Sequence, residues 1–365
     1  MGHSTTLEVR RDDYAQLRVR EDPLPESLEE GQVLLAVDHF ALTANNITYC
    51  QVGEAVGYWR FFPSDDPSVW GRVPAMGYAS VAVSAHPDIG VGERVWGFFP
   101  MSTHLLINAG QVHKHGFSDL SAHREGLAPI YCQFQRAAAN PLYEPAREAQ
   151  DCLLRGLFLT SWLCEDALQE HDYYGASDCL ITSASSKTSI ALAFALRDRG
   201  AVRRIALTSA RNRAFCESLG CYDEVFCYAE VTDLPLDRKV ILVDMAGDGP
   251  LNSRIHRHFG DQLRYDCRIG MTHRDAPAES EPSSNGPKPE MFFAPHQAAK
   301  RSADWGADVM EQRIGTSFAR FRVFADSWLG SVQFDGAAQA QQAFLATLRG
   351  AAAPSDGYSL SMNGH

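Results

Sequence analysis

Short strands and helices alternate along the second half of the chain, and this alternation restricts the fold more than any other feature. Segments with helical periodicity separate five short apolar runs, which lie at 179–182, 204–208, 225–228, 239–243 and 263–270. Strands that are separated by helices cannot pair as hairpins, so they need right-handed crossovers and form a parallel sheet covered on both faces. The pattern predicts an α/β domain of the nucleotide-binding type.

The first part of the chain has a different pattern. Apolar and polar residues alternate there in short runs between Gly, Pro and Asp turns, at 32–37, 79–83, 93–99 and 103–107. Such runs are typical of a small all-β unit with bent sheets. Because 365 residues exceed one average domain and 45% of them are apolar, two packed cores are expected. The change of pattern places the boundary at about residue 145.

Charge and cysteine content restrict the partners and the compartment. The net charge is -12, from 45 acidic and 33 basic residues, and the sequence has no basic stripe, so a nucleic-acid partner is not expected. The nine cysteines are odd in number and scattered, which predicts free thiols in a reducing compartment. The sequence shows neither a signal-peptide core nor an apolar run of membrane-spanning length. We therefore expect a soluble, cytoplasmic protein without membrane contact.

The segment after the first of these strands is the candidate phosphate-binding turn. In a doubly wound sheet this turn leads onto a helix whose N-terminal N–H groups and positive dipole end hold a diphosphate. Glycine normally occupies the turn. Here small and polar residues replace it, and the predicted ligands of the phosphates are Ser183, Ser185, Ser186, Lys187 and Thr188. A serine N-cap before an ordinary helix is the alternative interpretation.

The end of the second strand bears on the choice of cofactor. Dehydrogenases that use NAD place an acid here, which accepts hydrogen bonds from the ribose hydroxyls. This chain has Ser209 and Arg211 instead, with Arg213 shortly after. A hydroxyl and a guanidinium suit a 2′-phosphate, so the sequence favours NADP(H) over NAD(H). A solvent-facing Arg211 at the start of the next helix is the alternative.

Four stretches are similar to those of a known superfamily: VLLAVDHFALTANNITYCQVGE, VGERVWGFFPMSTHLLI, ITSASSKTSIALAFAL and LTSARNRAFCESLGCYDEV. Together they resemble the medium-chain dehydrogenase/reductase superfamily, and more narrowly a quinone/enoyl reductase-like branch catalogued as a domain of unknown function. The resemblance implies a GroES-like β-rich catalytic domain at 1–145, completed by 325–365, and a Rossmann doubly wound parallel-sheet domain that binds NADP(H) at 146–324. It also implies a cleft between them for substrate and nicotinamide. Dimers are common in this architecture, so a homodimer is a further expectation.

Zinc is not expected. Asn46, in the element Asn-Ile-Thr-Tyr, resembles the equivalent element of the quinone and enoyl reductases, where zinc-dependent alcohol dehydrogenases carry a cysteine ligand. The four-cysteine lobe that holds structural zinc is also missing. The nearest approaches to metal ligands are His113 with His115 and His256 with His258, and we interpret both as polar surface pairs.

Without zinc, a side chain or a backbone N–H must stabilise the negative charge that a hydride transfer builds on the substrate. The resemblance implies a tyrosine or an asparagine in this role. The candidates for the proton donor are Tyr49 and Tyr58, with Tyr131 as a third, and the hydrogen-bond donor is Asn46 or its neighbour Asn45.

Tyr58 begins the aromatic segment Tyr-Trp-Arg-Phe-Phe-Pro, in which Arg60 looks buried. This segment is a candidate lining for a substrate pocket, with Arg60 as the partner of an anionic substrate group. Plain packing of the aromatic rings around Arg60 is the alternative.

Three further positions follow from the expected topology. The resemblance implies that Asp244 and Gly247 pass beneath the nicotinamide ribose and that Gly270 meets the carboxamide, although ordinary strand-to-loop residues fit equally well. The segment 274–290 is rich in Pro, Ser, Asp and Glu, which is typical of a long loop or a lid.

Taken together, the pattern indicates an NADPH-dependent, zinc-independent oxidoreductase that reduces a ketone, an enone or a quinone-like small molecule. Two alternatives stay open. One is a non-reducing enzyme on the same fold, a hydrolase or lyase, because the serine-rich turn with Lys187 resembles Ser–Lys chemistry. The other is a protein that binds NADPH without catalysis.

Overall fold

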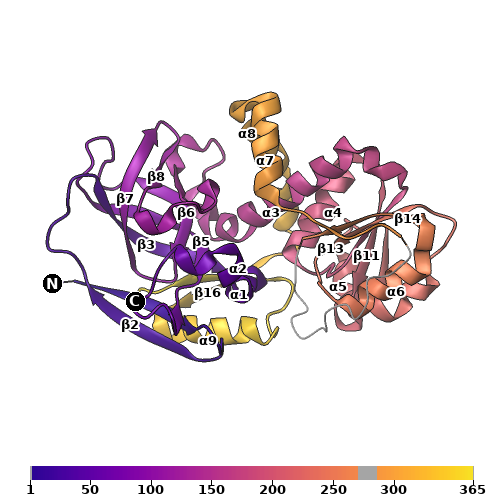
Figure 1. Cartoon of the computed structure of the whole chain (residues 1–365), viewed down its shortest axis with the longest axis horizontal. Coiled ribbons are helices and arrows are strands. Elements are labelled where there is room, and N and C mark those ends of the chain that lie inside the picture. The colour runs from indigo at the N-terminus through magenta and orange to yellow at the C-terminus, as the bar shows by residue number, and fades with distance from the viewer. Residues whose placement is uncertain (1, 270–285, 365) are drawn as a thin grey trace. The chain divides into compact units, whose positions relative to one another are not determined.

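The computed structural model describes residues 2–269 and 286–364, and the chain forms two compact units (Figure 1). One unit comprises Met1–Leu153 and Leu329–His365, and the other comprises Leu154–Trp328. The observed division falls inside the helix α3 (Glu148–Glu170) and shortly after α8 (Ala307–Ala325). The sequence pattern placed these boundaries at 145/146 and 324/325, because a continuous helix has no sequence signal at the point where it leaves one unit.

The second unit is built on a six-stranded sheet with the order β12-β11-β10-β13-β14-β15, in which every pair is parallel. The strands are β10 (Asp178–Ile181), β11 (Arg203–Thr208), β12 (Glu224–Cys227), β13 (Val240–Asp244), β14 (Leu263–Arg268) and β15 (Glu290–Met291). The first five lie within two residues of the predicted apolar runs. The α/β doubly wound parallel-sheet fold is therefore confirmed.

Helices lie on both faces of this sheet (Figure 1). They include α4 (Lys187–Arg199), α5 (Arg213–Ser218), α6 (Gly249–Phe259) and most of α3, whereas α7 (Ala294–Trp305) packs against α8, and α8 packs against α4. On one face Leu207 and Leu242 of the sheet pack against Leu251 and Ile255 of α6. Since β10 lies between β11 and β13, the chain changes direction at β10, and its carboxyl end is the place where such sheets bind ligands.

The first unit contains a closed antiparallel barrel. Its strands follow the order β3-β5-β6-β9-β8-β7, and a further pairing of β7 with β3 closes the ring. Their bounds are β3 (Gln32–Leu42), β5 (Pro74–Ser84), β6 (Arg94–Pro100), β7 (His104–His113), β8 (Gly116–Asp119) and β9 (Gln133–Arg136). Alternate residues such as Val33, Leu35, Ile107 and Phe134 fill the core. This is the β-rich unit that the sequence predicts.

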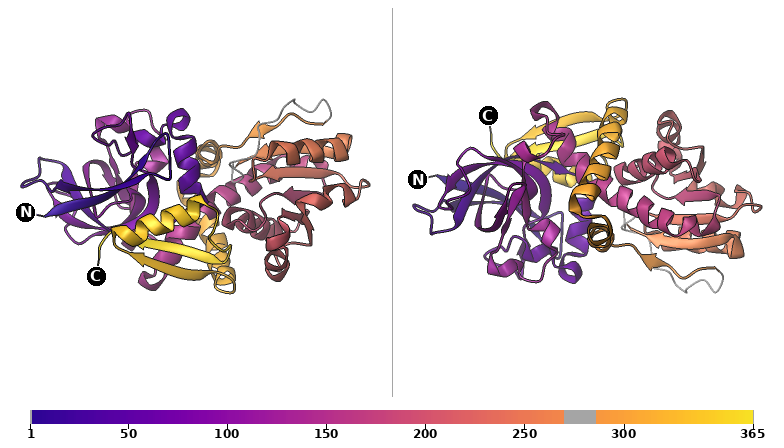
Figure 2. Two further views of the ribbon diagram at one scale, coloured as in Figure 1. Left: turned by 90° about the horizontal axis from the view of Figure 1, so that it is seen from below. Right: turned by 90° about the horizontal axis from the view of Figure 1, so that it is seen from above.

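The C-terminal residues complete this β-rich unit. Strand β17 (Asp356–Ser361) pairs antiparallel with β3 and parallel with β16 (Gly330–Asp335), and α9 (Ala337–Leu348) packs along both of them (Figure 2). A separate sheet consists of β1 (His3–Arg10), β2 (Leu17–Pro23) and β4 (Trp70–Gly71). None of the helices in the described ranges combines the length and the apolar character that a bilayer span requires.

A left-handed turn joins α3 to β10. Asp172, Tyr173 and Tyr174 have φ values of 49°, 47° and 54°, and Gly175 follows at 68°. Left-handed backbone costs about 1–2 kcal/mol for each residue other than glycine. The turn is held by a hydrogen bond of 2.6 Å from the Tyr173 hydroxyl to Glu165 Oε1 and by the Tyr174 ring, which stacks on Tyr265 at 4.1 Å.

Asp172→Gly tests the strain in this turn. Asp172 is exposed, and glycine adopts its φ at no steric cost. We expect the free energy of unfolding to rise by roughly 0.5–1 kcal/mol, because the relieved backbone strain exceeds the extra chain entropy of glycine. The control Asp198→Gly lies in the last turn of α4, where Asp198 also pairs with Arg320, and should lose about 1 kcal/mol. Urea unfolding measures the free energy of unfolding of both variants. A lower value for Asp172→Gly than for the native chain would show that the backbone at Asp172 is not strained.

Candidate functional site

The turn between β10 and α4 reverses the chain without any glycine. Ser183 has a φ of 49°, the left-handed conformation that glycine usually supplies. Ser186 is the N-cap of α4: its hydroxyl accepts from the Ser189 N–H at 3.2 Å, and its own N–H donates to the Ser183 carbonyl at 2.8 Å. Ser186 therefore caps α4, and the role of this turn in binding a phosphate stays a prediction. The cap directs the start of α4 toward the carboxyl end of β10.

Side chains from neighbouring strand ends hold this turn. The Tyr222 hydroxyl donates to the Ala184 carbonyl at 2.7 Å, and Asn212 Nδ2 donates to Ser185 Oγ at 2.9 Å. Tyr228 forms a hydrogen bond with the Ser183 backbone, and burial raises the pKa of its phenol, so the ring stays neutral. Sequence reasoning missed these residues. Their only signal is that they lie close to the ends of β11, which pairs with β10, and of β12, which pairs with β11.

The predicted phosphate ligands lie together on the outer side of the turn. The Ala184 methyl points inward and packs with Ala206 and Cys216 in a small core. In contrast, the five predicted side chains are all partly exposed: Ser183, Ser185, Ser186, Lys187 and Thr188. The first N–H groups of an α-helix have no acceptor within the helix. The start of α4 therefore presents donors that point out of the turn.

The Asp244 carboxylate joins the carboxyl ends of β10 and β13. It is fully buried, and Oδ1 accepts from Thr182 Oγ1 at 2.6 Å and from the Ala246 N–H at 2.9 Å. Oδ2 accepts from Asn252 Nδ2 at 2.7 Å, and the Gly247 N–H lies 3.2 Å from both oxygens. These bonds occupy the carboxylate that the sequence assigned to the ribose. Asp244 thus sets the shape of the two loops beside the predicted cofactor.

Gly247 closes this loop with a φ of 68°, in the left-handed region that favours glycine. Its position after β13 agrees with the predicted topology, and its contact with the ribose stays a prediction. Gly270 and residues 274–285 of the predicted lid lie outside the described residues. The end of that predicted segment enters the short edge strand β15 at Glu290.

The end of β11 places a hydroxyl and a guanidinium together. Arg211 is exposed in the short helix Ala210–Asn212 and forms no hydrogen bond or ion pair with the residues that the structure describes. The Ser209 hydroxyl oxygen is buried, and within the same ranges it has no hydrogen-bond partner. Arg213, in contrast, pairs with Glu217 at 3.0 Å and with Glu230 at 2.8 Å. Ser209 and Arg211 therefore fit an anionic group with several acceptor oxygens, and Arg213 does not.

In the β-rich unit, Asn46 belongs to the start of α1 (Ala44–Gln51). Its Oδ1 accepts from the Thr43 N–H at 2.7 Å, which completes a capping box, and its Nδ2 donates to the Pro74 carbonyl at 2.8 Å. The side chain is 3% exposed. The structure thus uses Asn46 to position α1. Asn45 is the partly exposed amide of the pair, and it bonds to Tyr49.

The three candidate tyrosines lie in one aromatic cluster. Tyr49 stacks on Tyr58 at 4.4 Å between ring centroids, and Tyr131 stacks on Phe98 at 4.8 Å. A hydrogen bond joins the hydroxyls of Tyr58 and Tyr131, and burial raises the pKa of Tyr49, Tyr58 and Tyr131. All three phenols are therefore neutral proton donors at physiological pH. Arg60 lies at the edge of this cluster, where it is exposed and donates to the Glu125 carbonyl at 2.8 Å, so the prediction of a buried Arg60 is wrong.

The histidine pairs differ from each other. His113 is exposed, but His256 is 3% exposed, and its Nε2 lies 2.8 Å from Asp266 Oδ2. His258 Nε2 lies 2.8 Å from the Leu234 carbonyl. The interpretation of His256 and His258 as a surface pair is wrong, because His256 is buried in contact with the Asp266 carboxylate on β14. In the described ranges no three His, Cys, Asp or Glu side chains are grouped to hold a metal ion.

Comparison with solved structures defines the class of this fold. CurA from Vibrio vulnificus matches with a TM-score of 0.64 and 12% identity over 99% of both chains, and a CurA structure in complex with NADPH matches with a TM-score of 0.62. The yhdH oxidoreductase from Salmonella enterica, in complex with NADP, matches with a TM-score of 0.54 and 13% identity over 98% of this chain and 99% of that chain. The fold is that of the medium-chain dehydrogenases/reductases, as predicted.

The family of the chain follows from its sequence. Residues 40–353 match the family described as "Protein of unknown function (DUF2855)", and the chain belongs to this family. No curated protein matches it. The predicted membership of a family catalogued as a domain of unknown function is therefore confirmed. The residues described above are the basis for assigning a function.

Thr182→Val tests the hydrogen-bond network of Asp244. The Thr182 hydroxyl donates to the carboxylate and accepts from the Met245 and Ala246 N–H groups at 2.8 and 3.0 Å. Its loss leaves buried polar groups unpaired, so the free energy of unfolding should fall by about 2–3 kcal/mol. Thr316→Val removes an exposed helix hydroxyl and should cost less than about 0.5 kcal/mol. If urea titration shows the same loss of unfolding free energy for both variants, the buried network does not stabilise the protein more than an exposed hydroxyl does.

Proposed function

We propose that this chain binds NADP(H) on its parallel-sheet unit and reduces a small ketone, enone or quinone-like molecule without zinc. The observation that carries the proposal is the pair of Ser209 and Arg211 at the end of β11, next to a phosphate-type turn at the end of β10. The likeness to folds that were crystallised with NADPH or NADP supports it.

Each part of the cofactor has residues that fit it. The start of α4, with Ser183 and Ser185, suits the diphosphate, because its donors point out of the turn. Ser209 and Arg211 suit the 2′-phosphate, because a hydroxyl and a guanidinium that have no partner among the described residues match its oxygens. When bound, the cofactor supplies a hydride. Tyr222, Asn212 and Tyr228 keep the turn in the shape that this binding needs.

The proton donor is assigned to the tyrosine cluster. Tyr49 and Tyr58 carry phenols whose pKa lies above the usual 10, so each holds its proton at neutral pH until negative charge develops nearby. Asn45, bonded to Tyr49, orients that hydroxyl.

The hydrolase alternative finds no support in the serine-rich turn. The Ser186 hydroxyl caps α4, and the Ser185 hydroxyl accepts from Asn212. Among the residues that the structure describes, these hydroxyls bond to Ser189 and Asn212 and not to a histidine or a lysine that could act as a base. A homodimer stays a prediction.

Arg211→Ala tests the choice of cofactor. The variant should bind NADPH about 30-fold more weakly, a loss of roughly 2 kcal/mol, because a charge-assisted hydrogen bond to the 2′-phosphate is gone. NADH affinity should hardly change. Arg264→Ala removes an exposed arginine from the start of β14 and serves as the control. Isothermal titration calorimetry measures the affinity of each variant for NADPH and for NADH. An equal loss of affinity for both cofactors would show that Arg211 does not contact the 2′-phosphate.

Tyr49→Phe and Tyr58→Phe test the proton donor. Each substitution keeps the aromatic packing and removes one hydroxyl. The variant that loses the acid should show a kcat at least about 100-fold lower with unchanged affinity for NADPH. The other should stay active. The assay is stopped-flow oxidation of NADPH with a panel of enones and quinones, and two fully active variants would remove both tyrosines from the chemistry.

A further inference from the structure

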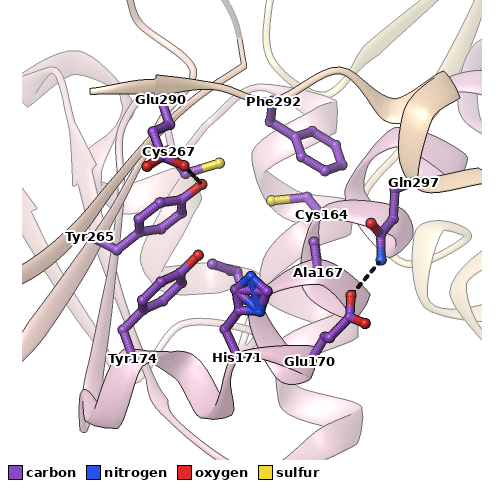
Figure 3. A pocket seen from close by; sticks show the side chains of 11 residues that line it. Cys164, Ala167, Glu170, His171, Tyr174, Tyr265, Cys267, Glu290, Phe292 and Gln297 are labelled. Atoms are coloured by element: carbon purple, nitrogen blue, oxygen red, sulfur yellow. Dashed lines mark hydrogen bonds between the residues drawn. The ribbon is translucent and has the colours of Figure 1, made fainter. Parts of the chain in front are cut away.

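A cavity of about 120 Å³ opens in the parallel-sheet unit between α3, β14, β15 and α7 (Figure 3). None of the predicted cofactor residues that the structure describes lines it. The lining residues are Cys164, Ala167, Leu168, Glu170, His171, Tyr174, Tyr265, Cys267, Glu290, Phe292 and Gln297. The cavity is thus a feature that the proposed reduction leaves unexplained.

Aromatic rings form much of the wall. Tyr174 and Tyr265 stack with 4.1 Å between centroids and 12° between their planes, and Phe292 lies across the cavity from them (Figure 3). The Tyr265 hydroxyl donates to Glu290 Oε2 at 3.2 Å. The left-handed turn brings Tyr174 into this position. Strained backbone of this kind persists where the surroundings fix it, and it is concentrated at ligand sites.

The charge around the cavity is negative. Of the described residues that line it, Glu170 and Glu290 are acidic and none is Lys or Arg. Two bases of α7, Lys300 and Arg301, form ion pairs with Glu170. Lys300 also pairs with Asp304, and Arg301 also pairs with Asp166 and Asp304. Lys300 and Arg301 thus offset Glu170, whereas Glu290 forms no ion pair with the described residues and leaves the lining with a net negative charge. An anionic ligand is therefore disfavoured, and a cation is attracted.

The base of the cavity is neutral. Cys164 and Cys267 are 0% and 1% exposed and are hydrogen-bonded to each other. This bond and burial raise the pKa of the Cys164 thiol well above its usual range, so the thiol carries no charge. A neutral, polarisable surface of this kind suits methyl or methylene groups.

We propose that this cavity binds the ammonium head of a small organic cation, with the Tyr174, Tyr265 and Phe292 rings and the Glu290 carboxylate around the charge. Aromatic faces next to a carboxylate are the usual environment for alkylated ammonium groups. The volume agrees with this, because an engineered cavity of about 150 Å³ holds benzene and a trimethylammonium group is smaller. The inference does not depend on the proposed reduction.

Choline and its uncharged isostere 3,3-dimethyl-1-butanol distinguish a charge-selective site from a merely apolar one. Calorimetric titration of the full chain, without cofactor, should show saturable binding of choline and at least about tenfold weaker binding of the alcohol. Glycerophosphocholine, in which the same head group carries a phosphodiester, should bind more weakly than choline because of the negative surroundings. Equal binding of choline and the alcohol would overturn the proposal, and so would no binding of choline. Equal binding of glycerophosphocholine would also overturn the assignment to a free cation.

Matched variants locate the site. Glu290→Gln keeps the shape and the hydrogen-bond acceptor but removes the charge, so choline affinity should fall about threefold to tenfold. Tyr265→Leu removes the ring and should lower it at least about tenfold, while Tyr265→Phe keeps the ring and should retain binding. Glu311→Gln, an exposed acid on α8, is the charge-matched control and should bind as the native chain does. If Glu290→Gln and Tyr265→Phe fold normally and Glu290→Gln binds choline unchanged, the cavity is not the site.

Discussion

The buried carboxylate of Asp244 is the interaction on which the arrangement at the end of the parallel sheet depends. A charge that is removed from water is tolerated only when its oxygens are fully bonded, and here Thr182, Asn252 and the backbone of the following loop provide the donors. The result is a direct connection between the carboxyl ends of β10 and β13, on either side of the point where the chain changes direction. Loops that diverge at such a point would otherwise move independently. The network gives the proposed cofactor site a fixed base.

The turn above this base shows how a phosphate-type loop can exist without glycine. Glycine usually supplies the left-handed residue and leaves room for the phosphates. Here Ser183 takes the left-handed conformation, and its cost is offset by the contacts of Tyr222, Asn212 and Tyr228 with the turn. The chain therefore replaces conformational freedom with side-chain support. Its partly exposed hydroxyls remain on the outer side, where the cofactor is proposed to bind.

Local signals explain how far the sequence alone leads. The strands β10 to β14 are short apolar runs between helices, so the parallel sheet could be predicted, and Arg211 stands at a strand end whose place the topology fixes. Asn46 was assigned to the substrate although Thr43 precedes it by three residues, a spacing that signals a capping box. The burial of His256 depends on Asp266, a partner on another element, and no local pattern indicates such a pairing. The left-handed turn at Tyr174 could not be predicted from the sequence either, because tyrosine rarely adopts this conformation.

Recognition of a 2′-phosphate by residues at the end of β11 underlies the proposed choice of cofactor, and the fluorescence of the reduced cofactor tests this recognition directly. Titration of NADPH with the native chain should give a saturable blue shift and increase in nicotinamide emission, and NADH at the same concentrations should give little change. The difference would report a site that distinguishes the two molecules by the one phosphate in which they differ. An emission that stays constant with both cofactors, or changes equally with both, would contradict the assignment of Ser209 and Arg211.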